Sequence, residues 1–439
     1  MTAQCPVAMR KKLCGRPTLS LTALPGLSEL SRGGGRSDVC LMHSPDIRKS
    51  VPHFQAELDA MRKQGNYDFT AFVFPPETQF GQMFSVPTSF ARSKFRGVAG
   101  FRGARFLGDV NFDDAIFESD ADFTDAYFGA SASFVETSFG PVDLIEQSLY
   151  QPKTVALFTG AKFAMAERAN FRRANHRAMQ GLRLRAIGCN IDAVNLEDVK
   201  WHREWGRIVL QDELDLVVWS VPLPKDDARS PAKQSRFSLF RSSSRKTYLA
   251  HVARQARFGS FQPTSPDVHE LVVAAYNRLL RNFDARLSHD DAEDAFCGAM
   301  EVKRIDPTAL PFSTLLGQLY RKAPILGSLC RSFTLLSLYK YVSRYGSSYQ
   351  RAIAVLLILL SVFAISYSVV GDLRLAEKAF SMNNIAMGIL AALEVASFQR
   401  ESIVIAQSMA GRSLRIAESI IIPAQLAITL LAVRRRFRR

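Results

Sequence analysis

Phenylalanine recurs through the middle of the chain at steps that alternate between five and six residues. The run begins at Phe90 and fills five successive eleven-residue units up to about Gly140, and most of its members follow a small residue by two positions. The run comprises Phe90, Phe95, Phe101, Phe106, Phe112, Phe117, Phe123, Phe128, Phe134 and Phe139. A helix would need apolar spacings of three and four, and a hairpin sheet would need strict alternation. The short fixed period instead predicts a solenoid, in which each unit buries its apolar face against the next coil.

The repeated unit can be read as a short extended stretch with a small residue, a polar residue and a phenylalanine. In such a stretch the first and third side chains point the same way, so both can face inward. Stacked coils lie about 4.8 Å apart, which would align the rings into continuous ladders. We therefore predict that these phenylalanines form the core and bind no ligand.

These units resemble the pentapeptide-repeat family, whose fold is a right-handed, four-sided β-helix with Leu or Phe at the centre of each five-residue side. The resemblance weakens but continues at residues 161–163, 169–171 and 193–196, and upstream at Phe69, Phe74, Phe80 and Phe84. It implies an all-β, right-handed quadrilateral β-helix over residues 66–200, clearest at 88–140. With four sides per coil, as the resemblance implies, the alternation of five and six gives about 22 residues per coil, with the extra residues at corners. The interruption at residues 141–155 predicts a loop or an irregular coil.

Charge is distributed very unevenly along the chain. The formal net charge is +15, which favours an anionic partner, either nucleic acid or a lipid surface. From Phe106 to Pro152, however, there is no Lys, Arg or His, and acidic residues are frequent. A solenoid that binds nucleic acid should carry its basic residues on the repeats. The distribution therefore favours membrane lipids as the partner and argues against nucleic acid.

No recognisable catalytic or metal-binding motif occurs. The six cysteines contain no C-x-x-C pair, and no two histidines have the spacing of metal ligands, so we predict a reduced compartment, no structural metal and no cofactor. No phosphate-binding loop, dinucleotide fingerprint, nucleophile elbow or H-E-x-x-H motif is present. We therefore predict a protein that is not an enzyme and has no small-molecule substrate.

Several segments outside the repeats have distinct compositions. Residues 1–65 are predicted to be mostly disordered, 201–221 form a mixed segment, and the Ser-, Pro- and Arg-rich stretch 222–262 reads as a linker. Residues 263–306 predict a helix pair, with Ser265 and Pro266 starting the first helix and Ser288 with Asp291 starting the second. We expect this pair to pack on the end of the solenoid or on a second copy.

The C-terminal part predicts a membrane hairpin at 351–439, preceded by juxtamembrane helices at 307–350 that include an interfacial helix at 325–341. Residues 352–370 carry no charge and can cross the bilayer, and a shorter apolar run covers 419–433. Basic residues flank the outer ends of both runs, which predicts that both termini are cytoplasmic. These are Lys340, Arg344, Arg351, Arg434, Arg435, Arg436, Arg438 and Arg439. The alternative is two buried helices of a soluble domain.

A further apolar stretch, 385–398, lies between the two spans and contains Glu394. Membrane-bound bacterial pentapeptide-repeat proteins often have this layout of repeats, helix pair and a channel-like hairpin with a basic end, and the C-terminal part of the chain resembles it. No Gly-Tyr-Gly-type filter follows Glu394, which argues against selective conduction. Glu394 is a candidate functional residue within the membrane, because carboxylates are costly there. The alternative places it at the interface near Arg400.

These observations lead to three hypotheses for function. The first is a membrane-anchored interaction or scaffold protein of the bacterial inner membrane, with a protein partner or a second copy of itself. The second is a subunit of an oligomeric, ion-channel-like membrane protein. The third is a DNA-mimicking inhibitor, as some members of the resembled family are, acting through the acidic face of the solenoid.

Overall fold

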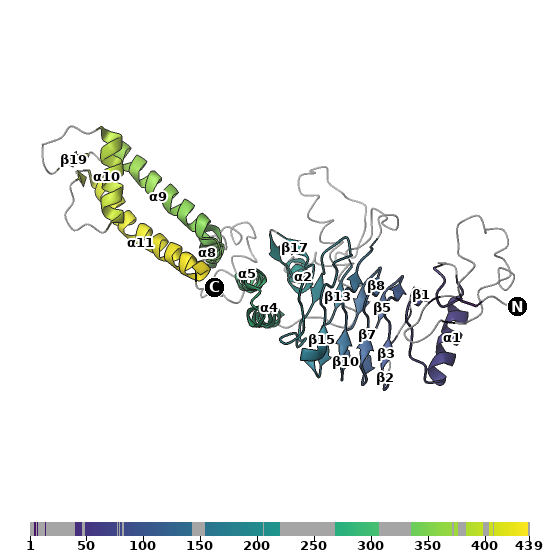
Figure 1. The fold of residues 1–439 in the computed structure, drawn as a ribbon. Helices are drawn as coiled ribbons and strands as arrows, with labels where there is room; N and C mark the ends of the chain where they lie inside the picture. Colours follow the sequence, from purple (N-terminus) through teal and green to yellow (C-terminus); the bar gives the residue numbers. More distant parts are fainter. Residues whose placement is uncertain are drawn as a thin grey trace, which may run out of the picture. The chain divides into compact units, whose positions relative to one another are not determined.

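A computed structural model shows two compact units, Met1–Val302 and Lys303–Arg439, connected along one chain (Figure 1). The first unit contains the repeats and the second is a helical unit with one small hairpin. The structure describes residues 4–5, 7, 14, 40–45, 49–76, 78, 80, 83–142, 154–204, 206–219, 268–306, 335–370, 373–375, 383–397, 404–406 and 408–437. The predicted linker at 222–262 lies outside these residues.

The repeats form four parallel sheets of four two-residue strands each. One sheet contains β1 (Val73–Phe74), β4 (Lys94–Phe95), β8 (Ile116–Phe117) and β12 (Ser138–Phe139). The second contains β2 (Met83–Phe84), β6 (Arg105–Phe106), β10 (Tyr127–Phe128) and β14 (Lys162–Phe163). The third contains β3 (Thr88–Ser89), β7 (Val110–Asn111), β11 (Ala132–Ser133) and β15 (Ala169–Asn170). The fourth contains β5 (Ala99–Gly100), β9 (Ala121–Asp122), β13 (Ala156–Leu157) and β16 (Leu184–Arg185).

The register of these sheets gives the length of one coil. Ala99 pairs with Ala121, and Lys94 pairs with Ile116, in each case a step of 22 residues. The chain therefore returns to the same sheet after four short strands, as the alternation of five and six predicts. Ala121 also pairs with Ala156 across the interruption at 141–155, so the inserted residues leave the stack in phase. Residues 143–153 of that insertion lie outside the described part of the chain.

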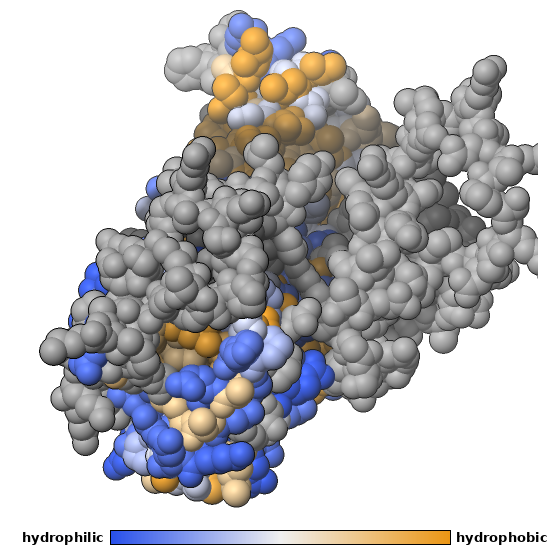
Figure 2. Space-filling model, turned by 90° about the vertical axis from the view of Figure 1, so that its right-hand side faces the viewer, coloured by the Kyte–Doolittle hydropathy of each residue, from blue (hydrophilic) through white to orange (hydrophobic). Residues whose placement is uncertain are grey.

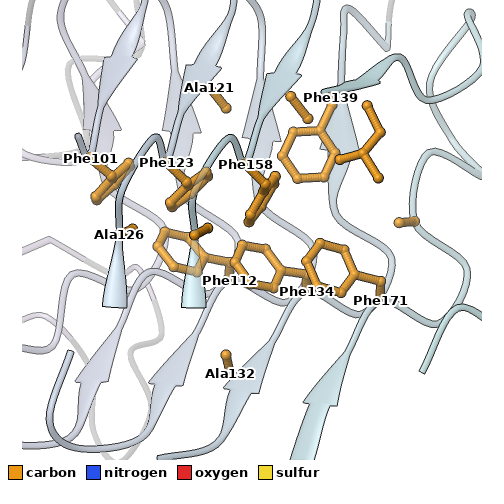
Figure 3. Close-up of a cluster of buried hydrophobic side chains, with 14 of the residues drawn as sticks. Phe101, Phe112, Ala121, Phe123, Ala126, Ala132, Phe134, Phe139, Phe158 and Phe171 are labelled. Atoms are coloured by element: carbon orange, nitrogen blue, oxygen red, sulfur yellow. The ribbon is translucent and has the colours of Figure 1, made fainter. Parts of the chain in front are cut away.

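The phenylalanine rings fill the interior as parallel ladders, two of which are drawn in Figure 3. Phe101, Phe123 and Phe158 stack in turn, with 4.8 Å between neighbouring ring centroids. A second ladder joins Phe112 to Phe134 at 4.9 Å and continues to Phe171. All ten phenylalanines of the predicted run are buried, which confirms that they form the core. The rings of one ladder also meet those of the neighbouring ladder edge to face, as Phe112 and Phe123 do, an arrangement that suits the aromatic quadrupole.

Each eleven-residue unit turns one of its two corners with a residue in the left-handed region. In the step that begins at Phe112, Asp114 has φ 59° and the N–H of Ala115 donates to the carbonyl of Phe112 over 3.0 Å. The same turn recurs with Gly103 at φ 66° and Glu136 at φ 54°. The turn points the following small residue inward, since Ala115 is fully buried. This geometry explains why a small side chain precedes each second phenylalanine by two positions.

A helix precedes the first coil, within the segment predicted to be mostly disordered. Helix α1 (Val51–Lys63) starts at Ser50, whose hydroxyl accepts from the backbone N–H of His53, and has proline in its first turn. Phe54, Leu58 and Met61 are buried on its inner side. The Phe54 ring meets that of Phe74 edge to face, with centroids 5.7 Å apart. The prediction of disorder was wrong for this stretch, because the apolar spacing of three and four indicates a helix.

The C-terminal end of the solenoid is covered by short strands and helices. Strands β17 (Arg203–Glu204) and β18 (Arg207–Ile208) form a hairpin, followed by α2 (Gln211–Trp219). The predicted helix pair is present as α4 (Val268–Ala285) and α5 (His289–Ile305), and α5 begins after Ser288 as expected. Ser265 and Pro266 lie outside the described residues. Buried residues of both helices join the solenoid core, so this pair packs on the end of the solenoid.

The second unit contains α8 (Leu335–Ser343), α9 (Tyr349–Val370), α10 (Asn384–Ala396) and α11 (Met409–Phe437), with a hairpin of β19 (Leu373–Leu375) and β20 (Val404–Ala406). Helix α11 is longer than the apolar run at 419–433, and it continues through Pro423 without a break. The helix therefore begins more than two turns before the apolar run. Of the predicted interfacial helix at 325–341, residues 325–334 lie outside the described part.

Candidate functional site

Among the residues that the structure describes, the interior of the solenoid contains no candidate site, because the predicted phenylalanines fill it. The rings lie in van der Waals contact along each ladder and are fully or almost fully buried. They stabilise the repeats and cannot form a stacking platform for a ligand. Any interaction of this part must therefore use the outer surface or the two ends.

The acidic residues of the solenoid face outward, and many of them bind the neighbouring coil. The Asp113 carboxylate accepts from the backbone N–H of Val135 over 2.9 Å, and the Asp120 carboxylate accepts from that of Val155 over 2.8 Å. Arg177 forms ion pairs with both Asp114 and Glu136, at 2.8 and 2.6 Å. The acidic run therefore contributes to pairing between coils, and arginines from later coils neutralise part of it.

The open end of the last coil is closed by polar side chains of α4. The side-chain amide of Asn282 donates to the carbonyls of Ile191 and Val194, over 2.7 and 2.8 Å. Arg278 donates to the carbonyl of Cys189 over 2.6 Å. These carbonyls have no further coil to pair with, and a buried unpaired carbonyl is costly. Helix α4 thus replaces the missing next coil.

A buried ionic network connects α4 to β18 and α2, which follow the solenoid. The Glu213 carboxylate receives two hydrogen bonds from Arg207 and one from the hydroxyl of Tyr276, the last over 2.6 Å. The Tyr276 hydroxyl also accepts from the backbone N–H of Leu210 over 3.0 Å. Burial, together with the Glu213 carboxylate, raises the pKa of Tyr276 well above its usual value. Because these groups are buried and mutually bonded, the network can hold α2 and α4 together but offers no exposed acid or base.

Asp212 lies on α2 beside this network. Its carboxylate accepts from the backbone N–H of Ala186 over 2.7 Å, so it binds the last strand of the fourth sheet to α2. Burial raises the pKa of Asp212 to about 7, although the charge of Arg185 and the bond from Ala186 act in the opposite direction. The side chain is only 3% exposed. Asp212 is therefore a buried group that changes protonation near neutrality rather than a reactive acid.

In the helical unit, Glu394 is buried at the end of α10. Its carboxylate accepts from the backbone N–H of Val404, the first residue of β20, over 3.2 Å. The Arg415 guanidinium lies 3.4 Å from the same carboxylate and donates to the carbonyl of Val404 over 2.9 Å. Glu394 thus joins α10, β20 and α11. Arg400, the alternative partner considered from the sequence, lies outside the described residues.

A second carboxylate, that of Glu418 on α11, is also fully buried in this unit. Tyr367 of α9 and Arg415 lie near enough to interact with it electrostatically. Together with Glu394, these residues form a polar cluster of Glu394, Arg415, Glu418 and Tyr367. The helices around it are tightly packed: α9 and α10 approach closely at Gly388, where an added Cβ would lie 2.3 Å from the carbonyl oxygen of Ala364.

The predicted basic flanks lie toward the same end of the helical unit. The side chains of Gln425 and Thr429 on α11 donate to the carbonyl of Ala352 at the start of α9, which makes the two helices antiparallel. The start of α9 therefore lies near the C-terminal end of α11 (Figure 1). Arg351 belongs to the first of these ends and Arg434 to the second. Lys340 belongs to α8 and Arg344 follows that helix. The side chains of Arg435 and Arg436 and all of Arg438 and Arg439 lie outside the described part.

The structure also brings together four residues that the sequence analysis did not connect. Cys5, Cys14, Cys40 and His43 place one sulfur or nitrogen atom each within 4.8 Å of all the others. The chain has no C-x-x-C pair and no two histidines at metal-ligand spacing, so pairs of one residue type do not reveal this cluster. The signal that could have found this cluster is the C-x-x-H spacing of Cys40 and His43, which is typical of one half of a metal site.

Comparison with protein families identifies the repeats. Residues 84–126 match the family model "Pentapeptide repeats (9 copies)". This match confirms the resemblance drawn from the phenylalanine pattern and agrees with the parallel strand stacks over the same residues. No curated protein and no solved structure significantly matches the chain.

Proposed function

We propose that this chain is a membrane-anchored pentapeptide-repeat scaffold, with no catalytic activity, in the bacterial inner membrane. The observation that carries the proposal is the apolar outer surface of the helical unit. Large apolar side chains of α9 and α11 are exposed over almost the whole length of both helices. They are Leu357, Ile358, Val362, Ile365 and Val369 on α9, and Ile416, Ile420, Ile421, Leu430 and Leu431 on α11. Figure 2 shows such apolar side chains, in orange, gathered at the top of the view.

Both helices are long enough to cross a bilayer. The apolar parts cover Tyr349–Val369, 21 residues, and Met409–Arg434, 26 residues. At about 1.5 Å per residue the shorter one extends about 31 Å, close to the thickness of the hydrocarbon core. Transfer of an exposed Ile or Leu side chain from water to an apolar environment is favourable by roughly 1.5–3 kcal/mol. These side chains would gain that free energy in lipid. A contiguous apolar surface of this size favours lipid as its surroundings.

The distribution of basic residues supports an orientation with both termini cytoplasmic. Arg351 at the start of α9 and Arg434 near the end of α11 lie toward one end of the antiparallel pair. Basic residues remain on the cytoplasmic side during insertion, so this end would face the cytoplasm. The repeats precede α9 in the chain and would be cytoplasmic too.

The solenoid supplies the surface for interaction in this proposal. Its interior is filled by aromatic rings, and its ends are covered by α1 and α4, so the outer faces of the four sheets are what it can present to a partner. The partner would be a protein or a second copy of this chain, together with the lipids that hold the anchor. The carboxylates of Asp113, Asp120 and Glu136 bind groups of neighbouring coils within the solenoid. This does not favour a DNA-mimicking role for the acidic face.

The proposal is tested by extraction and by protease accessibility in intact cells. We expect the chain to remain in the membrane pellet after alkaline carbonate treatment. Tags placed before Met1 and after Arg439 should both resist protease added from outside and become sensitive once the cells are opened. Release by carbonate would overturn the anchor, and digestion of either tag from outside would overturn the orientation.

A second candidate, an oligomeric channel-like subunit, is favoured by one observation. The short apolar helix α10 lies between the two long helices and carries the buried Glu394 beside Arg415. Two spans cannot enclose a pore alone, so this function requires several copies. A detergent-solubilised monomer with no conductance in planar bilayers would exclude it, and an oligomer whose conductance changes in Glu394→Gln would favour it over the scaffold.

A further inference from the structure

The four side chains brought together before the first coil have the spacing of a tetrahedral metal site. The Cys14 and Cys40 sulfurs are 3.7 Å apart, and Nδ1 of His43 lies 3.2 Å from the Cys40 sulfur and 3.6 Å from the Cys5 sulfur. Zn–S bonds of about 2.3 Å and a Zn–N bond of about 2.1 Å, arranged tetrahedrally, require edges of about 3.6–3.8 Å. The distances of 3.6 and 3.7 Å match these edges, the 3.2 Å distance is shorter, and all the ligand atoms lie within 4.8 Å of one another.

The orientation of His43 agrees with that of a metal ligand. Its Nδ1 faces the sulfurs of Cys5 and Cys40, while Nε2 lies 3.2 Å from the carbonyl oxygen of Thr70. That carbonyl can only accept, so Nε2 carries the proton and the lone pair of Nδ1 is directed at the cluster. Histidine ligands commonly donate their other ring N–H to a backbone carbonyl, which fixes the tautomer and the ring. The Phe72 ring packs edge-on against the imidazole with centroids 5.1 Å apart.

Burial and nearby charge also suit a bound cation. Cys5, Cys40 and His43 are buried. Three thiolates and a neutral imidazole around a divalent ion leave a net charge of −1 at the site. Lys49, itself buried, donates to the carbonyls of Leu41 and Ser44, on the turn that carries Cys40 and His43. Its ammonium would offset that charge.

We propose that Cys5, Cys14, Cys40 and His43 bind one Zn²⁺ ion in a closed, structural Cys₃His site. Four protein ligands leave no open position for a substrate, as expected of a structural rather than a catalytic zinc. A set of sulfur and nitrogen donors around a single point favours Zn²⁺ over hard cations. An iron–sulfur cluster would spread its ligands over more than one metal atom, and here all four ligand atoms lie within 4.8 Å of one another.

The site would form part of the N-terminal cap of the solenoid. The backbone N–H of Val73 in β1 donates to the carbonyl of Met42, between the ligands Cys40 and His43, over 2.9 Å. His43 binds Thr70, and Lys49 also donates to the carbonyl of Val73. A metal ion would therefore fasten residues 5 and 14, distant in sequence, to the edge of the first coil. Repeat arrays need such capping of their end units.

Metal analysis of the full chain, purified in detergent without chelator, tests the proposal. We expect about one zinc per chain by elemental analysis, and visible d–d bands of tetrahedral Co²⁺ with thiolate charge-transfer bands when cobalt replaces it. Cys40→Ser and His43→Ala should lower zinc affinity by more than about tenfold. His43→Cys keeps four ligands and should retain the metal. Cys297→Ala, a buried cysteine of α5 outside the cluster, is the matched control and should bind zinc like the wild type.

Three results would overturn the site. One is a wild-type protein that neither contains zinc nor gives the tetrahedral cobalt spectrum when reduced and titrated with Co²⁺. Another is undiminished zinc in Cys40→Ser. The third is a disulfide between Cys14 and Cys40, detected by mass spectrometry of the alkylated protein. The cobalt titration uses the unaltered chain, so the test does not depend on the folding of any variant.

Discussion

The ring of Phe123 lies 5° from parallel to that of Phe101, with the two centroids 4.8 Å apart. The same ring stacks on Phe158 of the following coil at 4.8 Å, so one side chain joins three coils. The stability of the solenoid depends on such contacts between neighbouring coils.

Replacing Phe123 with alanine should lower the free energy of unfolding of the repeats by about 3–5 kcal/mol. The change leaves a cavity between two rings that cannot move together without breaking strand pairs. Unfolding can be followed by denaturant titration with tryptophan fluorescence, because all three tryptophans, Trp201, Trp205 and Trp219, directly follow the solenoid. Leu107→Ala removes an apolar side chain that is 42% exposed and serves as control. Equal effects of the two variants would refute the ladder.

Asn282→Ala should destabilise the C-terminal cap by about 1–3 kcal/mol, since it leaves buried carbonyls of the last coil without a donor. The side-chain amide contacts Ile191, Asp192 and Val194 through their carbonyls. Hydrogen exchange should therefore increase in α4 and in residues 184–196 before it increases in the central coils. The exposed Arg281 on the same helix, which pairs with Asp192 at the surface, offers a control in Arg281→Ala. A uniform increase along the whole solenoid would argue against a local cap.

Asp212 should make the stability of the first unit depend on pH. Its pKa is raised to about 7 by burial, so the folded state holds a proton that the unfolded state releases above its ordinary pKa of 3.8. The free energy of unfolding is therefore highest below about pH 4, where Asp212 is protonated in both states. It falls as the pH rises toward about 7 and stays constant above that. Asp212→Asn remains neutral throughout and can still accept from Ala186. We expect the variant to gain stability over the wild type between pH 5 and pH 8, measured as the difference of their melting temperatures. A difference that does not change with pH would show that Asp212 is ionised in the folded chain.

A charge on the outer surface of α9 should impair membrane insertion. Ile365 is 64% exposed and lies in the middle of the C-terminal half of α9. If that surface faces lipid, Ile365→Lys should cost up to about 2.5–3.5 kcal/mol of insertion free energy. Leu271→Lys makes the same kind of change at a 42% exposed position of α4 and should have no effect on membrane association. The fraction of each variant that resists carbonate extraction gives the comparison, and equal fractions would contradict a lipid-facing α9.

The repeats could be predicted from the sequence because the residues that contact one another in adjacent coils recur at a fixed spacing along the chain. The alternation of phenylalanine at five and six residues indicates which side faces inward, and together with the four sides of the resembled fold it gives the length of a coil and the pairing of Ala99 with Ala121. The apolar helices α9 and α11 could be predicted because composition alone indicates them. The start of α11 could not be predicted in this way, because the first turns of the helix contain Arg412, Arg415 and Glu418 and do not belong to the apolar run.

The two caps of the solenoid were not predictable in the same way, because they depend on contacts between residues far apart in the chain. Asn282 binds carbonyls about ninety positions earlier, and no local pattern indicates that pairing. Cys5 and Cys14 meet Cys40 and His43 in space, and the first coil fixes the turn that carries the latter two through Val73 and Thr70. Glu394 illustrates the same limit. The sequence identified it as a costly charge, and only the fold shows that it binds β20 and α11.

A coil of 22 residues built from two units of eleven also fixes the angle between the two ends of the solenoid. Deleting 22 residues, such as 101–122, would shorten the stack by one layer, about 4.8 Å, and leave α1 and α4 facing the same directions as before. Deleting eleven would keep every ladder in phase but rotate one cap by half a turn relative to the other. The number of repeats thus determines both the distance between the two ends of the solenoid and the relative direction in which they face.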